Sequence, residues 1–124
     1  MTAPTGQPGP TEDQVSMPPG HQSPGPAGHQ LGPVGQEVVF ENDRVRVWHI
    51  RLTPGESQPL HRHDHPYLVI AVQGARNVVQ TIDGTRIDAD EPTGGVVFRE
   101  PGAVHMLTNI GDTTYVARLV ELLR

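Results

Sequence analysis

The chain has 124 residues and a formal net charge of −5, contains no cysteine, and carries all nine of its basic side chains as arginine. A chain of this length allows one domain. The arginines are scattered singly, which disfavours nucleic acid as a partner because phosphate binding needs clustered positive charge. Without cysteine, disulfides and thiolate metal sites are excluded, so any metal must be held by imidazole and oxygen ligands.

Residues 1–36 contain eight prolines and seven glycines. Because such a segment has little apolar surface to offset the entropy of ordering, we predict a disordered tail over 1–36 and a folded domain over 37–124. The tail lacks the basic start and apolar run of a secretory signal, and no stretch approaches the roughly 18 apolar residues that a bilayer span needs. We therefore expect a soluble, cytoplasmic protein without a membrane partner.

From Glu37 onward, short extended segments alternate with turn signals. Arginines alternating with β-branched and aromatic residues predict a strand over 44–52, and Asp83-Gly84 marks a hairpin. The continuously apolar run 67–72 is consistent with a strand buried on both faces. The remaining expected strands are 75–82, 85–89, 95–100, 103–110 and 115–123. Only the last of these could instead be a helix. Such strands, with turns about every ten residues, indicate an all-β sandwich or small barrel.

Three of the seven histidines, His61, His63 and His65, fall at alternate positions within five residues. Side chains at i and i+2 of a strand share a face, so His61 and His63 can converge on one ion. His105 stands near the start of another expected strand, after a proline–glycine turn. Three imidazoles from two strands leave open coordination positions, as a catalytic first-row metal requires. The alternative is that these histidines are polar groups without a metal.

The spacing around these histidines resembles the two motifs of the cupin superfamily. The first motif is matched by Gly55-x5-His61-x-His63-x3-Tyr67-x6-Gly74, in which tyrosine replaces the usual glutamate. The second is matched by Gly94, Gly102, His105 and Asn109. The resemblance spans about residues 38–123. It is to small single-domain, RmlC-like cupins, and in particular to a little-characterised branch associated in places with β-alanine degradation.

The resemblance implies a jelly-roll barrel, or double-stranded β-helix, that holds one divalent metal such as Fe(II), Mn(II), Ni(II) or Zn(II). It implies His61, His63 and His105 as the ligands. Tyr67 takes the place of the fourth ligand, which leaves that position open to Tyr67 or water. His65 is expected in the turn beyond the pair, at the rim of the site. The small size and the habit of the family also lead us to expect a homodimer.

Two classes of function are compatible with such a site. Open positions on the metal allow a substrate to bind together with dioxygen or water, which predicts a metal-dependent enzyme of the dioxygenase or isomerase/lyase type acting on a small molecule. Tyr67 and His65 are the candidate catalytic residues beside the ligands. The alternative is a non-catalytic cupin that binds metal or a small ligand. An enzyme should show further polar groups converging on its pocket, whereas a binder can have a sealed or apolar barrel.

Overall fold

The computed structural model of the protein describes Ser23–Pro24 and residues 30–124. These residues form eleven strands and no helix, and nine of the strands lie in the predicted domain. The strands are β1 (Ser23–Pro24), β2 (Gln30–Leu31), β3 (Glu37–Glu41), β4 (Val45–Leu52), β5 (Ser57–Arg62), β6 (Tyr67–Gln73), β7 (Asn77–Thr81), β8 (Arg86–Asp88), β9 (Val96–Arg99), β10 (Val104–Asn109) and β11 (Tyr115–Leu122). Within the described part of the chain, nothing has the helical length and apolarity that a membrane-spanning helix requires.

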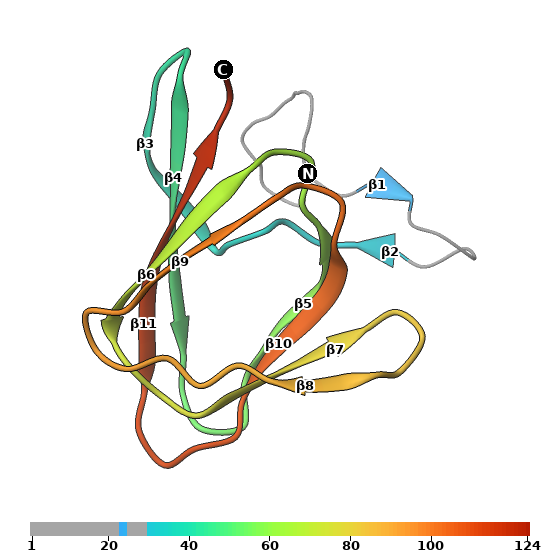
Figure 1. The fold of residues 1–124 in the computed structure, drawn as a ribbon, viewed down its shortest axis with the longest axis vertical. Coiled ribbons are helices and arrows are strands. Elements are labelled where there is room, and N and C mark those ends of the chain that lie inside the picture. The colour runs from blue at the N-terminus through green and yellow to red at the C-terminus, as the bar shows by residue number, and fades with distance from the viewer. Residues whose placement is uncertain (1–22, 25–29) are drawn as a thin grey trace.

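Two antiparallel sheets form the body of the protein and face each other across its interior (Figure 1). One sheet has five strands in the order β3-β4-β11-β6-β9, and the other has four in the order β5-β10-β7-β8. β1 and β2 form a separate antiparallel pair. Sheet neighbours such as β4 and β11 are far apart along the chain, which is the connectivity of a jelly roll. The predicted all-β jelly roll is confirmed.

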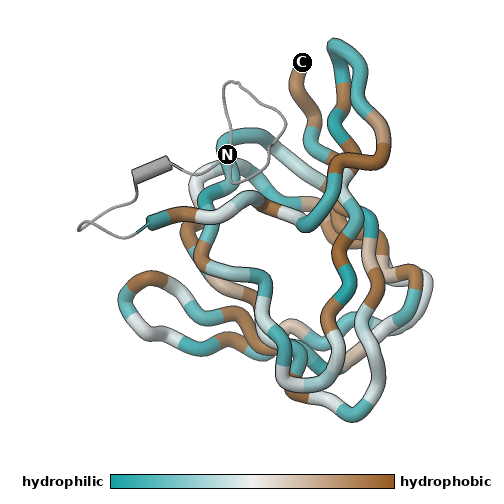
Figure 2. Tube along the Cα trace, turned by 180° about the vertical axis from the view of Figure 1, so that it is seen from behind, coloured by the Kyte–Doolittle hydropathy of each residue, from teal (hydrophilic) through white to brown (hydrophobic). Residues whose placement is uncertain are grey.

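The centre of the five-stranded sheet follows the period of two that the sequence predicts. Every second residue of β4 and β11 is buried, and hydrophobic and hydrophilic residues alternate around the barrel (Figure 2). Trp48 and Leu119 lie opposite each other across these strands and belong to the buried cluster between the sheets. Burial at every second residue requires an extended chain, because a helix buries every third or fourth. The helical alternative for 115–123 is therefore wrong.

Strand β6 differs from prediction in its burial. Tyr67 and Ala71 face the interior and are buried, but Val72 on the opposite face is 52% exposed. Burial on both faces is wrong here because only one face of each jelly-roll sheet covers the core. The outward face continues onto the neighbouring strand β9, where Val96 and Phe98 are 60% and 48% exposed. An apolar surface therefore covers the outside of this edge of the sheet.

The hairpin predicted at Asp83-Gly84 joins β7 to β8. Gly84 adopts a φ of 91°, a left-handed conformation that residues with a Cβ rarely tolerate. Its amide donates to the carbonyl of Thr81 over 2.9 Å and closes the turn. The Asp-Gly signal is thus explained by the backbone conformation that the turn requires.

Part of the predicted tail packs on the barrel. Leu31 and Val34 are each only 1% exposed, and the amide of Gly32 donates to the carbonyl of Leu60 over 2.8 Å. A Cβ on Gly35 would lie 2.6 Å from Cβ of Trp48, so only glycine allows this close approach. The packed region therefore begins before Glu37. The disorder predicted for 1–22 and 25–29 lies outside the described residues.

Replacing Leu31 with alanine should destabilise the protein by about 2–5 kcal/mol, because it removes a fully buried side chain. Urea unfolding of the full chain measures this loss. Ile87→Ala is the matched control, since Ile87 is 52% exposed and its truncation should cost less than about 1 kcal/mol. Equal, small losses for the two variants would show that residues 30–36 do not pack on the barrel.

Candidate metal centre

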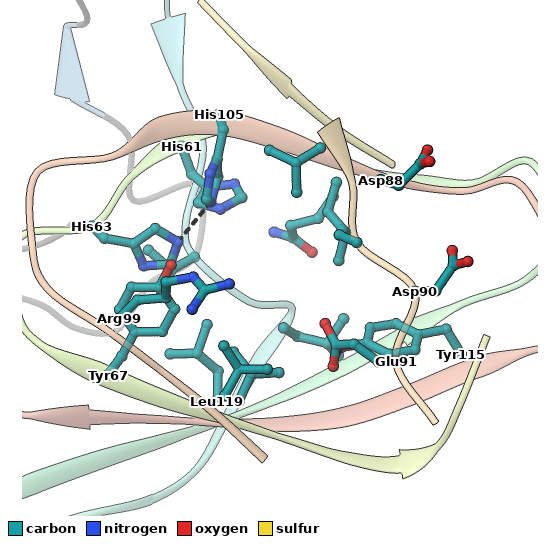
Figure 3. Close-up of a pocket in the computed structure, with 18 residues that line it drawn as sticks. His61, His63, Tyr67, Asp88, Asp90, Glu91, Arg99, His105, Tyr115 and Leu119 are labelled. Carbon is teal, nitrogen blue, oxygen red and sulfur yellow. Dashed lines mark hydrogen bonds between the residues drawn. The ribbon is translucent and has the colours of Figure 1, made fainter. Parts of the chain in front are cut away.

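The three predicted ligand histidines lie together on the four-stranded sheet (Figure 3). His61 belongs to β5, His63 follows directly after that strand, and His105 belongs to β10. His61 and His105 are paired across the two strands. One ligand nitrogen from each of the three rings lies within 4.8 Å of the others. The cluster could therefore hold a metal ion.

Hydrogen bonds and packing orient the three rings. Nδ1 of His61 lies 2.7 Å from the carbonyl oxygen of Pro59. A carbonyl only accepts, so Nδ1 carries the proton and Nε2 keeps a free lone pair. Nε2 of His63 and Nε2 of His105 face each other over 3.1 Å. The ring of His63 also stacks on Tyr67, with centroids 3.8 Å apart and an interplanar angle of 12°.

Burial keeps the three rings neutral. It lowers the pKa of His61 to about 3, with help from His105, and lowers the pKa of His63 well below its usual range. Burial and then the positive charge of Arg99 lower the pKa of His105 to about 4. Neutral imidazole is the form that binds metal, and Nδ1 of the buried His63 has no hydrogen-bond partner among the described residues. The donor set therefore fits one divalent transition metal.

Tyr67 occupies the position of the usual cupin glutamate and contributes an aromatic wall. Its side chain is buried, and burial raises the pKa of its hydroxyl to about 12. A neutral phenol is a poor metal ligand, so the ring acts here by stacking on His63 and limiting its rotation. A catalytic part for the hydroxyl stays a prediction.

His65 lies apart from the cluster, in the connection between β5 and β6. It belongs neither to the group of three histidines nor to the lining of the pocket beside them. Burial, and then the nearby charge of Arg46, lower its pKa to about 4. The structure places His65 away from the pocket, and a catalytic role for it also stays a prediction.

The histidines open onto a cavity of about 260 Å³ between the two sheets. Its volume suits a small molecule rather than a drug-sized ligand. Sequence reasoning missed the other polar side chains that line it. They are Gln58, Asp88, Asp90, Glu91, Arg99 and Tyr115. The polar groups thus converge on the cavity from both sheets and from the loop before β9.

One pair of these polar residues is linked within the pocket. The hydroxyl of the buried Tyr115 donates to Oε1 of Glu91 over 2.8 Å. Burial raises the pKa of Glu91 although this hydrogen bond and Arg99 oppose it. A carboxyl with a raised pKa beside a pocket is suited to exchange a proton with a bound molecule.

Comparisons with known proteins agree with this architecture. A cupin domain from Bordetella pertussis Tohama I superimposes with a TM-score of 0.64 at 28% identity, over 69% of this chain and 88% of the other. An RmlC-like cupin with a double-stranded β-helix fold from Methanocaldococcus jannaschii gives a TM-score of 0.56 at 16% identity, over 73% and 93%. The β-alanine degradation protein BauB of Pseudomonas aeruginosa is 32% identical over 72 residues, which are 58% of this chain and 75% of BauB. The chain belongs to the cupin superfamily. No family model matches it.

The relationship to BauB supports the branch of the cupins that the sequence motifs indicated. The second cupin motif also has a physical explanation in this structure. Gly102 adopts a φ of 116° in the turn that leads into the strand of His105. The buried side chain of Asn109 donates through Nδ2 to the carbonyls of Leu52 (2.9 Å) and Thr113 (2.7 Å). In this cupin the motif therefore builds the turns on either side of β10.

We expect the metal-free cupin to lose stability as the pH falls from about 6.5 towards 4. Below pH 6.5 the unfolded chain binds protons at His61, His63 and His105, while the folded chain, with its lowered pKa values, does not. The unfolded state then holds more protons, and each histidine removes about 1.4 kcal/mol per pH unit. Glu91 and Glu121, whose pKa values burial raises, offset part of this loss.

Urea unfolding at pH 7, 6 and 5 measures this pH dependence. The variant His105→Gln should show a smaller loss on acidification than the wild type, because it lacks one of the titrating rings. An identical pH dependence in the two proteins would contradict the lowered pKa of His105.

Proposed function

We propose that this cupin is a metal-dependent enzyme that acts on a small organic molecule held in its barrel. The observation that carries the proposal is the convergence of polar side chains on the pocket. The pocket is lined by three neutral histidines, by the positively charged Arg99, and by the hydrogen-bonded pair Glu91–Tyr115. A carboxyl and a hydroxyl that can exchange protons beside three candidate metal ligands favour an enzyme over a sealed or apolar binding barrel.

Each pocket residue has a distinct part in the proposal. His61, His63 and His105 would hold one divalent metal, of which Fe(II), Mn(II), Ni(II) and Zn(II) are the candidates. When bound, this metal would supply Lewis acidity or, as Fe(II), a site for dioxygen chemistry. Glu91 would accept or return a proton, and the hydroxyl of Tyr67 would donate a hydrogen bond to the bound molecule.

The name of a related protein suggests which substrates to test first. BauB is named a β-alanine degradation protein. Small carboxylates related to β-alanine are therefore the first candidates for this chain. Their size agrees with a cavity of about 260 Å³.

Turnover by the metal-loaded protein tests the proposal. The protein, purified without a histidine tag, would be loaded in turn with Fe(II), Mn(II), Ni(II) and Zn(II) and incubated with three-carbon acids in air. Substrate loss would be followed by NMR and dioxygen uptake by electrode. We expect at least one metal to support turnover in the wild type and none to support it in His105→Ala. Binding without turnover under every metal would favour the non-catalytic alternative.

We also propose that the protein forms a homodimer through the outer face of the five-stranded sheet. Val72, Val96 and Phe98 expose apolar surface there, and Leu68 and Ile70 lie on the same face. Neighbouring exposed apolar side chains of this kind mark interaction surfaces. Sedimentation should show a dimer that Phe98→Glu converts to a monomer. A wild type that stays monomeric at high concentration would contradict this assembly.

A further inference from the structure

The side chains that face the interior of the barrel lie in layers, because every second residue of a strand points to the same side. The first layer is polar. It contains His105 on β10 and the cross-strand pair Tyr67–Arg99 on β6 and β9. These side chains lie beside His61 and His63 (Figure 3). Candidate metal ligands and a guanidinium at one level suit the polar head of a bound molecule.

The second layer, two residues along the strands from the first, is aliphatic. Leu107 and Val79 lie opposite each other across β10 and β7. Val69 and Val97 lie opposite each other across β6 and β9. All four side chains line the cavity between the two sheets. We call these four residues the aliphatic layer.

The aliphatic layer keeps accessible surface although it faces the interior. Each of its four side chains is half-buried, whereas Ile50 and Leu119, which also line the cavity, are only 3% exposed. A molecule in the cavity can therefore reach this layer. Apolar surface that stays in contact with water is unfavourable, and a hydrocarbon group that covers it gains binding free energy.

A third layer closes the cavity beyond the aliphatic one. Ala71, Asn77 and Asn109 lie two residues further along β6, β7 and β10, and each is 0% exposed. Glu91 and Tyr115 line the cavity at the side away from the histidines (Figure 3). The aliphatic layer is thus a single step deep, and two residues of a strand span about 7 Å. A long hydrocarbon chain would meet closed packing or polar groups.

We propose that the pocket recognises a molecule with a polar head and a short hydrocarbon chain, such as a saturated acid of about four to six carbon atoms. The head lies beside the candidate metal ligands and Arg99, and the chain packs against the aliphatic layer. Leu107 and Val97 determine specificity, because they limit the space that the chain can fill. This inference rests on the proposed function and names its substrate class, which is more apolar than β-alanine.

A series of straight-chain acids tests the inference by binding rather than by turnover. Calorimetry on the full chain, Zn(II)-loaded and metal-free, would compare ethanoate, propanoate, butanoate, pentanoate, hexanoate and octanoate. We expect the affinity to rise about fourfold with each methylene and to fall beyond about six carbons. The same increment is expected without metal, because the methylenes contact side chains and not the ion. Pentanoate should bind more tightly than 3-methoxypropanoate, in which an ether oxygen replaces one methylene.

Variants inside and outside the cavity provide the controls. Val97→Leu adds bulk to the aliphatic layer and should move the optimum to an acid about one carbon shorter. Leu107→Ala removes bulk and should move the optimum to a longer acid. Val39→Leu makes the first change on a side chain of β3 that is 45% exposed and does not line the cavity. It should leave the optimum unchanged.

Three results would overturn the inference. They are an affinity that does not rise from ethanoate to butanoate in either form of the protein, equal binding of pentanoate and 3-methoxypropanoate, and a wild-type optimum in both Val97→Leu and Leu107→Ala. The wild-type series decides even if neither variant folds. A rising affinity without turnover of any acid would contradict the enzyme proposal and leave the recognition of the chain intact.

Discussion

Replacing His105 with alanine should remove stoichiometric divalent metal from the protein. The variant keeps two imidazoles, His61 and His63, from a single stretch of chain, and loses the ligand that the neighbouring strand β10 supplies. Altering groups that only orient metal ligands costs about 10–100-fold in affinity, so loss of a ligand should cost on the order of 100-fold or more. Metal content after dialysis, measured by mass spectrometry on tag-free protein, gives the result directly. His61→Ala should behave in the same way.

Two histidine variants serve as matched controls. His65→Ala removes a neighbouring imidazole that lies outside the cluster, and His49→Ala removes one from the five-stranded sheet. Both should retain about one equivalent of metal. Loss of metal in His65→Ala together with retention in His61→Ala would show that His65, and not His61, is a ligand. Wild-type metal content in every variant would show that these histidines do not form the site.

Replacing Glu121 with alanine should destabilise the protein by about 3–5 kcal/mol. Glu121 is fully buried on β11, where its Oε1 lies 3.2 Å from Nη1 of Arg46 and accepts a hydrogen bond from Nε1 of Trp48 over 2.7 Å. Among the described residues, its removal leaves the buried guanidinium of Arg46 with only the partly exposed Glu41 as a counter-ion. It also leaves the indole of Trp48 without an acceptor. Urea unfolding at pH 7 measures the loss.

An exposed ion pair provides the comparison for Glu121. Asp43 lies 3.2 Å from Arg124, and their side chains are 71% and 64% exposed. Asp43→Ala makes the same change in charge but should cost less than about 1 kcal/mol, because solvent screens the pair. The loss of stability in Glu121→Gln should fall between those of the two alanine variants, since the amide oxygen can still accept the hydrogen bond from Trp48. Similar small losses for Glu121→Ala and Asp43→Ala would show that the buried pair contributes no more than the surface one.

The metal cluster could be predicted from the sequence because each of its histidines is marked by residues that lie close to it in the chain. His61 and His63 are two residues apart, and His105 is marked by the proline–glycine turn before its strand. The alternating burial of β4 and β11 was predictable for the same reason, since one period describes the whole strand. The prediction that residues 67–72 are buried on both faces was wrong, as the exposed Val72 shows. A continuous apolar run does not reveal that the outer face of the sheet lies outside the core.

The rest of the pocket depends on long-range register, which a single sequence does not contain. Arg99 is one of nine scattered arginines, and only its pairing opposite Tyr67 brings it beside the histidines. Gln58 acquires its orientation from Pro33, which lies 25 residues earlier. The packing of Leu31 could not be predicted, because the many prolines and glycines of residues 1–36 dominate the composition of a segment that contains only a few anchoring residues. Specific contacts, rather than composition, determine which part of such a segment packs.

Anomalous diffraction from crystals of the metal-loaded protein tests the central claim most directly. We predict one anomalous peak per chain at the absorption edge of the bound metal, within about 2.0–2.3 Å of Nε2 of His61, His63 and His105. The peak should also lie at the wall of the cavity that Arg99 and Gln58 line. A metal-replete crystal whose peak lies elsewhere on the chain, or is held by only one of the three rings, would contradict the account.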